Sequence, residues 1–172
     1  MTTSYIITFI GDDRPGLVED LAQVIADNNG NWLESRLSQL AGKFAGIIRV
    51  SLDGDNVSDF QQALENLTRK GLSVRVRQVD GERTAAGRVI VLTAIGPDRP
   101  GIVREISSAL ATHKLNVVEM DSRVSSAPMT AEQLFEAIIH IEVTATDAID
   151  TLSDTLDEIA NEMTLDIHLE ES

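Results

Sequence analysis

The sequence predicts an α+β protein made of two repeated βαββαβ units, each a four-stranded antiparallel sheet with two helices on one face. One observation is a repeat: "GDDRPGLVEDLA", which begins at Gly11, returns as "GPDRPGIVREIS" at Gly96. Another is that each copy follows an apolar run rich in β-branched residues and precedes apolar residues at helical spacing. The third is that strands of strict period two close each half.

The first strand and first helix come before and after the repeated motif. "SYIITFI" and "RVIVLTAI" are nearly continuous apolar runs, as buried strands require. A helix follows in each copy, indicated by the spacing of Leu17, Leu21, Val24, Ile25 and Asn28, and of Ile102, Ile106, Ala109 and Leu110. "NNGN" supplies a glycine signal that ends the helix of the first copy.

A hairpin is predicted next, with its first strand beginning near Asn31 or Asn116. In the second copy the returning strand alternates clearly, with one apolar face formed by Phe135, Ala137, Ile139, Ile141 and Val143. The offset between the copies grows from 85 at Gly11/Gly96 to 91 at Phe44/Phe135. Since "RVSSAPMTAEQ" contains this insertion, we expect a longer hairpin connection in the second copy.

A second helix and a last strand complete each unit. The helices are indicated by the stripes Val57, Phe60, Leu64 and Leu67, with Asp55 and Asn56 as candidate N-caps, and Ile149, Leu152, Leu156, Ile159 and Met163. "LSVRVRQV" and "LDIHLE" then alternate apolar and charged residues. The order predicts a ferredoxin-like topology. The polar segment "DGERTAAGR" marks a linker, which gives domains over 1–80 and 89–172 with a linker over 81–88.

Composition excludes several classes of function. The chain has 172 residues, no cysteine and a formal charge of −14, so disulfides and thiolate sites are excluded and binding to phosphate backbones is disfavoured. Residues 1–86 carry 12 acidic and 9 basic side chains, and residues 87–172 carry 16 and 5. With no membrane-spanning run and no signal peptide, we expect a cytoplasmic protein without direct contact to nucleic acid or membrane.

The repeated Asp-Arg-Pro-Gly lies between strand and helix, where backbone amides are exposed. We expect Pro at the first helical position and Gly directly after it, which leaves the first-turn N–H groups uncovered for a small carboxylate. Asp12, Asp13 or Asp98 would then face an amino group, with Asn31 or Asn116 as a hydrogen-bond partner. The alternative is that Gly packs tightly against the second strand, while Asp13 and Asp98 only form turns or caps.

The tandem units, with "DRPGLV" and "DRPGIV" after the first strand and "GNWLES" and "LNVVEM" opening the second, resemble ACT domains. Over residues 4–170, including "RVSSAPMT", the chain is similar to the glycine-cleavage-system transcriptional repressor family. The resemblance implies amino-acid sensing between paired units and regulation through protein contact. By position, the ligand loops would be Gly11, Asp13, Gly16 and Leu17 with Asn31 across from them, and Gly96, Asp98, Gly101 and Ile102 with Asn116.

The two copies differ at the loops: Asp12 becomes Pro97, and Gly30 becomes Leu115. We therefore expect the two loops to bind a ligand unequally.

Other chemistry-bearing residues are scattered. The three histidines lack the spacing of a zinc site, and the adjacent carboxylates at 12–13 are more typical of caps than of a Mg²⁺ site. No candidate nucleophile has an identifiable base nearby in the sequence. We therefore expect no metal, no cofactor and no catalysis. Trp32 is interpreted as a core or interface anchor, or as a residue flanking the ligand. Arg75 and Arg77 either form an exposed sheet face or dock the acidic half of a neighbouring chain.

These observations lead to one hypothesis about function and two rivals. The main hypothesis is a non-enzymatic regulator that responds to a small amino acid such as glycine and acts through a protein partner such as a transcription activator. A homo-oligomer is expected because exposed sheet edges invite pairing. The rivals are a structural or interaction module, and an orphan regulatory subunit of an amino-acid biosynthetic enzyme.

Overall fold

The computed structural model describes residues 2–53, 57–79, 81, 87–144 and 147–171. The chain divides into two compact units, residues 1–82 (unit 1) and 83–172 (unit 2). The division falls within the stretch 81–88 predicted as a linker, most of which lies outside the described residues. Unit 1 contains β1 (Thr2–Asp12), α1 (Leu17–Asp27), β2 (Asn31–Leu40), β3 (Lys43–Asp53), α2 (Val57–Arg69) and β4 (Ser73–Gln78).

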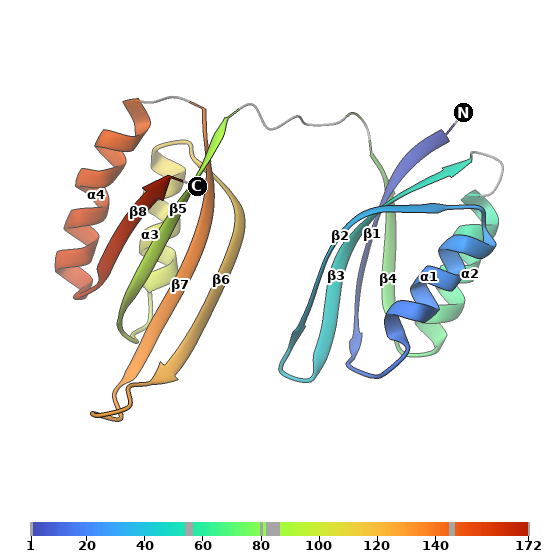
Figure 1. Cartoon of the computed structure of the whole chain (residues 1–172), viewed down its shortest axis with the longest axis horizontal. Coiled ribbons are helices and arrows are strands. Elements are labelled where there is room, and N and C mark those ends of the chain that lie inside the picture. Colours follow the sequence, from blue (N-terminus) through green and yellow to red (C-terminus); the bar gives the residue numbers. More distant parts are fainter. Residues whose placement is uncertain (1, 54–56, 80, 82–86, 145–146, 172) are drawn as a thin grey trace. The chain divides into compact units, whose positions relative to one another are not determined.

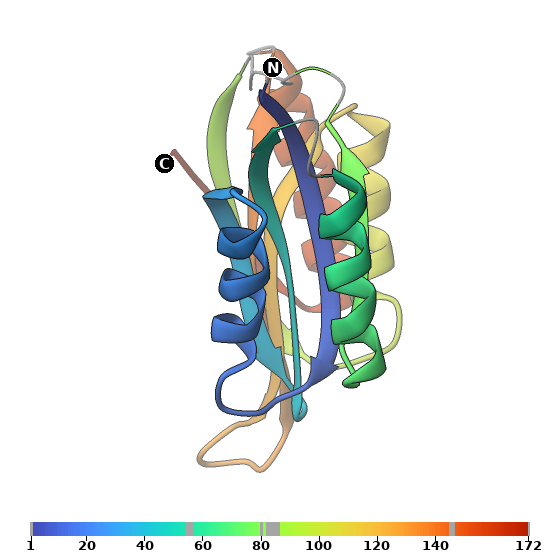
Figure 2. The same ribbon diagram turned by 90° about the vertical axis from the view of Figure 1, so that its right-hand side faces the viewer.

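Unit 2 repeats the same order of elements. It contains β5 (Arg88–Pro97), α3 (Ile102–Thr112), β6 (Asn116–Ser126), β7 (Gln133–Val143), α4 (Asp147–Met163) and β8 (Asp166–Glu171). The strand orders are β2-β3-β1-β4 and β6-β7-β5-β8, and all neighbours are antiparallel. In each unit both helices lie on one side of the sheet (Figures 1 and 2). The predicted α+β, ferredoxin-like class is confirmed.

The core of each unit lies between the sheet and its two helices. The predicted helical stripes are buried there: Phe60, Leu64 and Leu67 in α2, and Leu152, Leu156 and Ile159 in α4. The apolar face predicted for the strand of unit 2 is also buried, at Phe135, Ala137, Ile139, Ile141 and Val143. Periodicity therefore located the core correctly. The candidate N-caps Asp55 and Asn56 lie outside the described residues.

The hairpins of the two units differ as the insertion predicts. β2 and β3 are joined by Ala41 and Gly42 alone, whereas β6 and β7 are joined by residues 127–132. Trp32 lies near the start of β2, is partly buried and packs against the core of unit 1, which supports its interpretation as a core residue.

Candidate functional site: the two helix entrances

The Asp-Arg-Pro-Gly motif forms the turn from β1 into α1 and from β5 into α3. The expectation that proline would be the first helical residue is wrong. The helices begin one residue after the glycine, at Leu17 and Ile102, and the glycine itself is the N-cap. The backbone of Gly16 has φ 85° and that of Gly101 has φ 101°, which is the left-handed region that L side chains rarely adopt.

This backbone conformation explains why glycine recurs in both copies. A Cβ atom added at Gly16 would meet no atom within 4 Å, and at Gly101 only the Arg104 Nη2 atom at 4.0 Å. The tight packing against the second strand that was considered as an alternative is therefore absent at both positions. Glycine is required for its positive φ, and the space beside it stays open.

Among the described residues, no side chain caps the backbone amides of the first helical turn. The first helical hydrogen bonds run from Asp20 N to Gly16 O and from Glu105 N to Gly101 O, both at 2.9 Å. Residues that precede these donors have no intrahelical acceptor for their N–H groups. The N-cap residues provide no side-chain hydrogen bond to the helix. The side chains of Leu17 and Ile102 are buried in the core, so these two predicted site residues can offer a ligand only their amides.

The motif's aspartates lie three residues before these glycines, and their carboxylates are exposed. Their backbones are fixed, since Asp13 N donates to Gly42 O at 3.0 Å and Asp98 N donates to Gln133 O at 2.8 Å. Within the described part of the chain, neither carboxylate makes a hydrogen bond or an ion pair. Each entrance thus presents uncovered donors and one uncommitted acceptor group.

Unit 1 has a hollow at its entrance, with a volume of about 340 Å³. It is lined by residues 13–14 and 16–19 of the turn and by Phe44 of β3. The Phe44 ring also contacts Phe9, with centroids 5.8 Å apart. The sequence did not identify Phe44 as a site residue, although its alignment with Phe135 shows that both copies have phenylalanine at this position.

The arginines of the two motifs have different partners. Arg14 Nη2 lies 2.6 Å from Asp20 Oδ2, so this guanidinium lies across the first turn of its own helix. Arg99 Nη2 donates to Met163 O at 2.5 Å, at the C-terminus of α4. A cation placed at a helix C-terminus is favoured by the helix dipole.

The remaining charges also differ between the entrances. Asp12 of unit 1 pairs with Lys43, and the hydrogen bond and charge of that lysine lower the pKa of the Asp12 carboxyl below its ordinary value. The corresponding strand pair in unit 2 is Pro97 and Leu134, which carries no charge. Conversely, unit 2 places Arg104 in the first turn of α3, 2.7 Å from Glu105 Oε1. Unit 1 has Glu19 at the corresponding helical position.

The structure does not bring the predicted asparagines to these entrances. Gly11 pairs with Phe44 on β3, whereas Asn31 pairs with Ser51, seven residues further along that strand. At about 3.3 Å per residue the separation is roughly 23 Å. Asn116 is displaced from Gly96 in the same way in unit 2. The reason is that the first helix carries the chain to the opposite end of the unit before the second strand begins.

Two further observations on the described residues concern metals and membranes. No group of three or more potential metal-ligating side chains comes together there. No helix in this part of the chain is long and apolar enough to cross a membrane.

Two tandem βαββαβ units, each with an uncapped helix entrance after its first strand, define a repeated domain of the ferredoxin-like class. The chain belongs to the ACT domain family, whose model matches residues 3–77 and 88–170. Both units are therefore ACT domains.

Comparison with known proteins adds a regulatory context. The chain is 26% identical over 145 residues to the glycine cleavage system transcriptional repressor of Escherichia coli, covering 81% of this chain and 73% of that one. The crystal structure of an unknown protein from Galdieria sulphuraria matches all of this chain and 99% of its own, with a TM-score of 0.89 and 28% identity. A solved structure provisionally assigned as a glycine cleavage system transcriptional repressor has a TM-score of 0.72 over 99% of this chain and 97% of its own; at 16% identity it shows the fold alone. The homology supports a regulatory role.

Proposed function

We propose that this chain is a non-enzymatic regulator that binds a small amino acid at its helix entrances and acts through a protein partner in the cytoplasm. The observation that carries the proposal is the pairing of uncapped first-turn amides with an uncommitted carboxylate at each entrance. Amides at a helix N-terminus bind a carboxylate, and an aspartate accepts hydrogen bonds from an ammonium group. The left-handed glycine leaves open the space beside it, where a side chain would otherwise lie.

The two entrances differ in their attraction for a ligand carboxylate. The first turn of α3 carries Arg104 beside Glu105, whereas the first turn of α1 carries Glu19 and Asp20. An added cation strengthens binding of an anion at a helix N-terminus, and added carboxylates weaken it. The entrance of unit 2 is therefore the tighter site, and that of unit 1 is the weaker one.

The test is isothermal titration of the whole chain with glycine, glycinamide and N-acetylglycine. Glycinamide lacks the carboxylate and N-acetylglycine lacks the ammonium group, so each analogue removes one of the two contacts. We expect heat and a raised melting temperature with glycine or another α-amino acid, and at least about tenfold weaker binding of both analogues of the amino acid that binds. No heat with any amino acid in a panel of twenty would overturn the sensing proposal.

Variants assign the binding to a loop. Asp98→Asn keeps the size of the side chain and removes its charge, so it should weaken amino-acid binding about tenfold, and Asp13→Asn should have a smaller effect. Because both carboxylates are exposed and make no described contact, the melting temperature without ligand should not change. Glu65→Gln on the exposed side of α2 is the matched control. An interaction module without a ligand predicts identical titrations for all four proteins.

The protein partner is proposed from the relatives described as transcriptional repressors. Cross-linking of the tagged chain in its own cells, followed by mass spectrometry, should recover a transcription factor whose yield changes when the amino acid is supplied. Recovery of a biosynthetic enzyme instead would favour the orphan-subunit alternative. With a formal charge of −14, the chain alone should not retard DNA in a mobility-shift assay.

A further inference from the structure

Each unit leaves one side of its sheet uncovered by its own helices, and we call these sides the open faces. Side chains alternate along each strand, so the strand pairings assign every residue to the helix side or the open face. On both open faces two isoleucines at equivalent positions are largely exposed. Ile10 and Ile47 are each 51% exposed in unit 1, and Ile95 and Ile138 are 40% and 49% exposed in unit 2.

The charges around these isoleucines have opposite signs on the two faces. The open face of unit 1 carries five basic and three acidic residues on its strands, a formal charge of +2: Arg36, Lys43, Arg49, Arg75, Arg77, Asp12, Glu34 and Asp53. The open face of unit 2 carries one basic and six acidic residues, a formal charge of −5: Arg123, Glu119, Asp121, Glu136, Glu142, Asp166 and Glu170.

The reversal occurs at matched positions of the repeat. Arg36 lies opposite Ile47 in unit 1, and Asp121 lies opposite Ile138 in unit 2. On the other outer strand Arg77 pairs with Ile6, and Glu170 pairs with Val91 at the corresponding place. Duplication has thus kept the apolar centre of the open face and inverted the charges on both sides of it.

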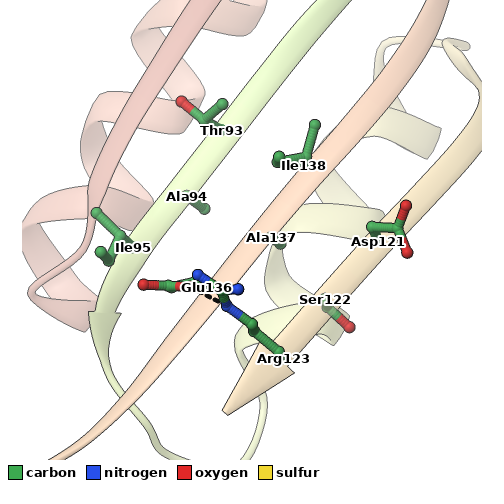
Figure 3. A pocket seen from close by; sticks show the side chains of 9 residues that line it. All are labelled: Thr93, Ala94, Ile95, Asp121, Ser122, Arg123, Glu136, Ala137 and Ile138. Carbon is green, nitrogen blue, oxygen red and sulfur yellow. Dashed lines mark hydrogen bonds and ion pairs between the residues drawn. The ribbon is translucent and has the colours of Figure 1, made fainter. Parts of the chain in front are cut away.

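The open face of unit 2 is also hollowed. A depression of about 610 Å³ lies over β5, β6 and β7, with Ile95 and Ile138 on its walls. Figure 3 shows Asp121 at one side and Arg123 directed toward Glu136, with which it forms an ion pair. This apolar hollow is surrounded by acidic residues, so it complements exposed apolar side chains that are surrounded by basic residues. Ile10 and Ile47 of unit 1 are such side chains.

We propose that the open face of unit 1 binds the open face of unit 2 of a second copy of this chain, and that the contact is reciprocated in a twofold dimer. Neighbouring strands lie about 4.8 Å apart, and the four strands of a sheet overlap over roughly seven residues. The area of one open face is therefore roughly 450 Å². A stable interface buries about 800 Å² per partner, so one pair of faces falls short and the reciprocal pair reaches it. Pairing of like faces is disfavoured because it places charges of the same sign together.

The test gives each face the charges that its counterpart carries. Variant one is Arg36→Asp with Arg77→Glu, which changes the formal charge of the unit 1 face from +2 to −2. Variant two is Glu119→Arg with Asp121→Arg and Glu170→Arg, which changes that of the unit 2 face from −5 to +1. Light scattering after size exclusion at 50–500 mM NaCl should show a dimer for the unaltered chain and at least about 100-fold weaker dimerisation for each variant alone. Mixing the two variants should restore the dimer, because every contact then joins opposite charges again. Arg69→Asp with Lys70→Glu, at the exposed end of α2, is the matched control and should remain dimeric.

The mixing experiment separates this proposal from its alternatives. A wild-type chain that is monomeric at 100 µM would overturn the proposal, as expected if each face were occupied within its own chain. Variants that remain monomeric when mixed would overturn it as well. A dimer that neither variant weakens would show that another surface joins the copies. Circular dichroism of each variant confirms that loss of the dimer is not loss of the fold.

Discussion

The two helix entrances share their backbone and most residues of the repeated motif, and they differ in the charged contacts around it. Both place a left-handed glycine at the N-cap, and both leave the first-turn amides uncapped. Yet Arg14 crosses its own helix to Asp20, while Arg99 reaches the end of α4 at Met163. The two copies have therefore kept the glycine that the turn requires, while the charged contacts near a ligand have diverged.

The first prediction concerns Gly11 and Gly96, each of which comes just before the last residue of the first strand of its unit. A Cβ atom at Gly96 would lie 2.7 Å from the backbone oxygen of Thr164, whereas at Gly11 its nearest atom is the side-chain Leu72 Cδ1 at 2.8 Å, and the backbone oxygen of Gly71 is at 3.2 Å. A backbone oxygen cannot move aside as a side-chain methyl group can. Gly96→Ala should cost about 3 kcal/mol and Gly11→Ala about 1 kcal/mol. Hydrogen exchange of buried amides measures the loss in each unit separately.

Alanine at an exposed helical position, as in Ser108→Ala, is the control for the substitution itself. Equal losses of stability in Gly11→Ala and Gly96→Ala would contradict the prediction. They would mean that the two sites accommodate a Cβ atom equally well, whether the nearest atom belongs to the backbone or to a side chain.

The sequence predicted the elements well and the entrances only in part. Apolar periodicity depends on burial, and burial is what places Phe60 or Leu152 against a sheet. The start of the helix was misplaced because a proline suits the first helical position, and periodicity contains no signal for the positive φ that makes Gly16 the N-cap instead. The expected position of Asn31 is wrong because the helix between the motif and Asn31 carries the chain to the other end of the unit.

The open faces show a second limit of sequence reasoning. Alternation in the last strand of unit 1 identified Arg75 and Arg77 as neighbours on one face, and the structure agrees. Arg36 and Asp121 could not be added to these faces, because a register shift between Trp32 and Glu34, and another between Val117 and Glu119, reverses the alternation inside those strands. Only the pairings show which side the residues after the irregularity occupy.

The second prediction compares the two motif arginines. Arg99→Met removes a charged donor from the last carbonyl of α4 and should cost about 1 kcal/mol, with faster exchange in the last turn of that helix. Arg14→Met removes an ion pair whose side chains are 42% and 34% exposed, so it should cost about 0.3 kcal/mol. Urea denaturation followed by Trp32 fluorescence reports unit 1, and exchange in α4 reports unit 2. Equal losses would mean that Arg99 acts only as another surface charge.

The smallest expected effect is electrostatic and belongs to unit 1 alone. Lys43→Met should raise the pKa of the Asp12 carboxyl toward its ordinary value, because the lysine's hydrogen bond and charge are what lower it. A carboxyl whose pKa is lower in the folded than in the unfolded state adds stability at neutral pH and loses it as the pH falls through the folded-state pKa. NMR titration of the Asp12 carboxyl carbon measures this pKa, with Lys70→Met as the control. Pro97 cannot ionise, so unit 2 should have no carboxyl titration that corresponds to that of Asp12. An Asp12 pKa that does not change in Lys43→Met would contradict the proposed effect of the lysine.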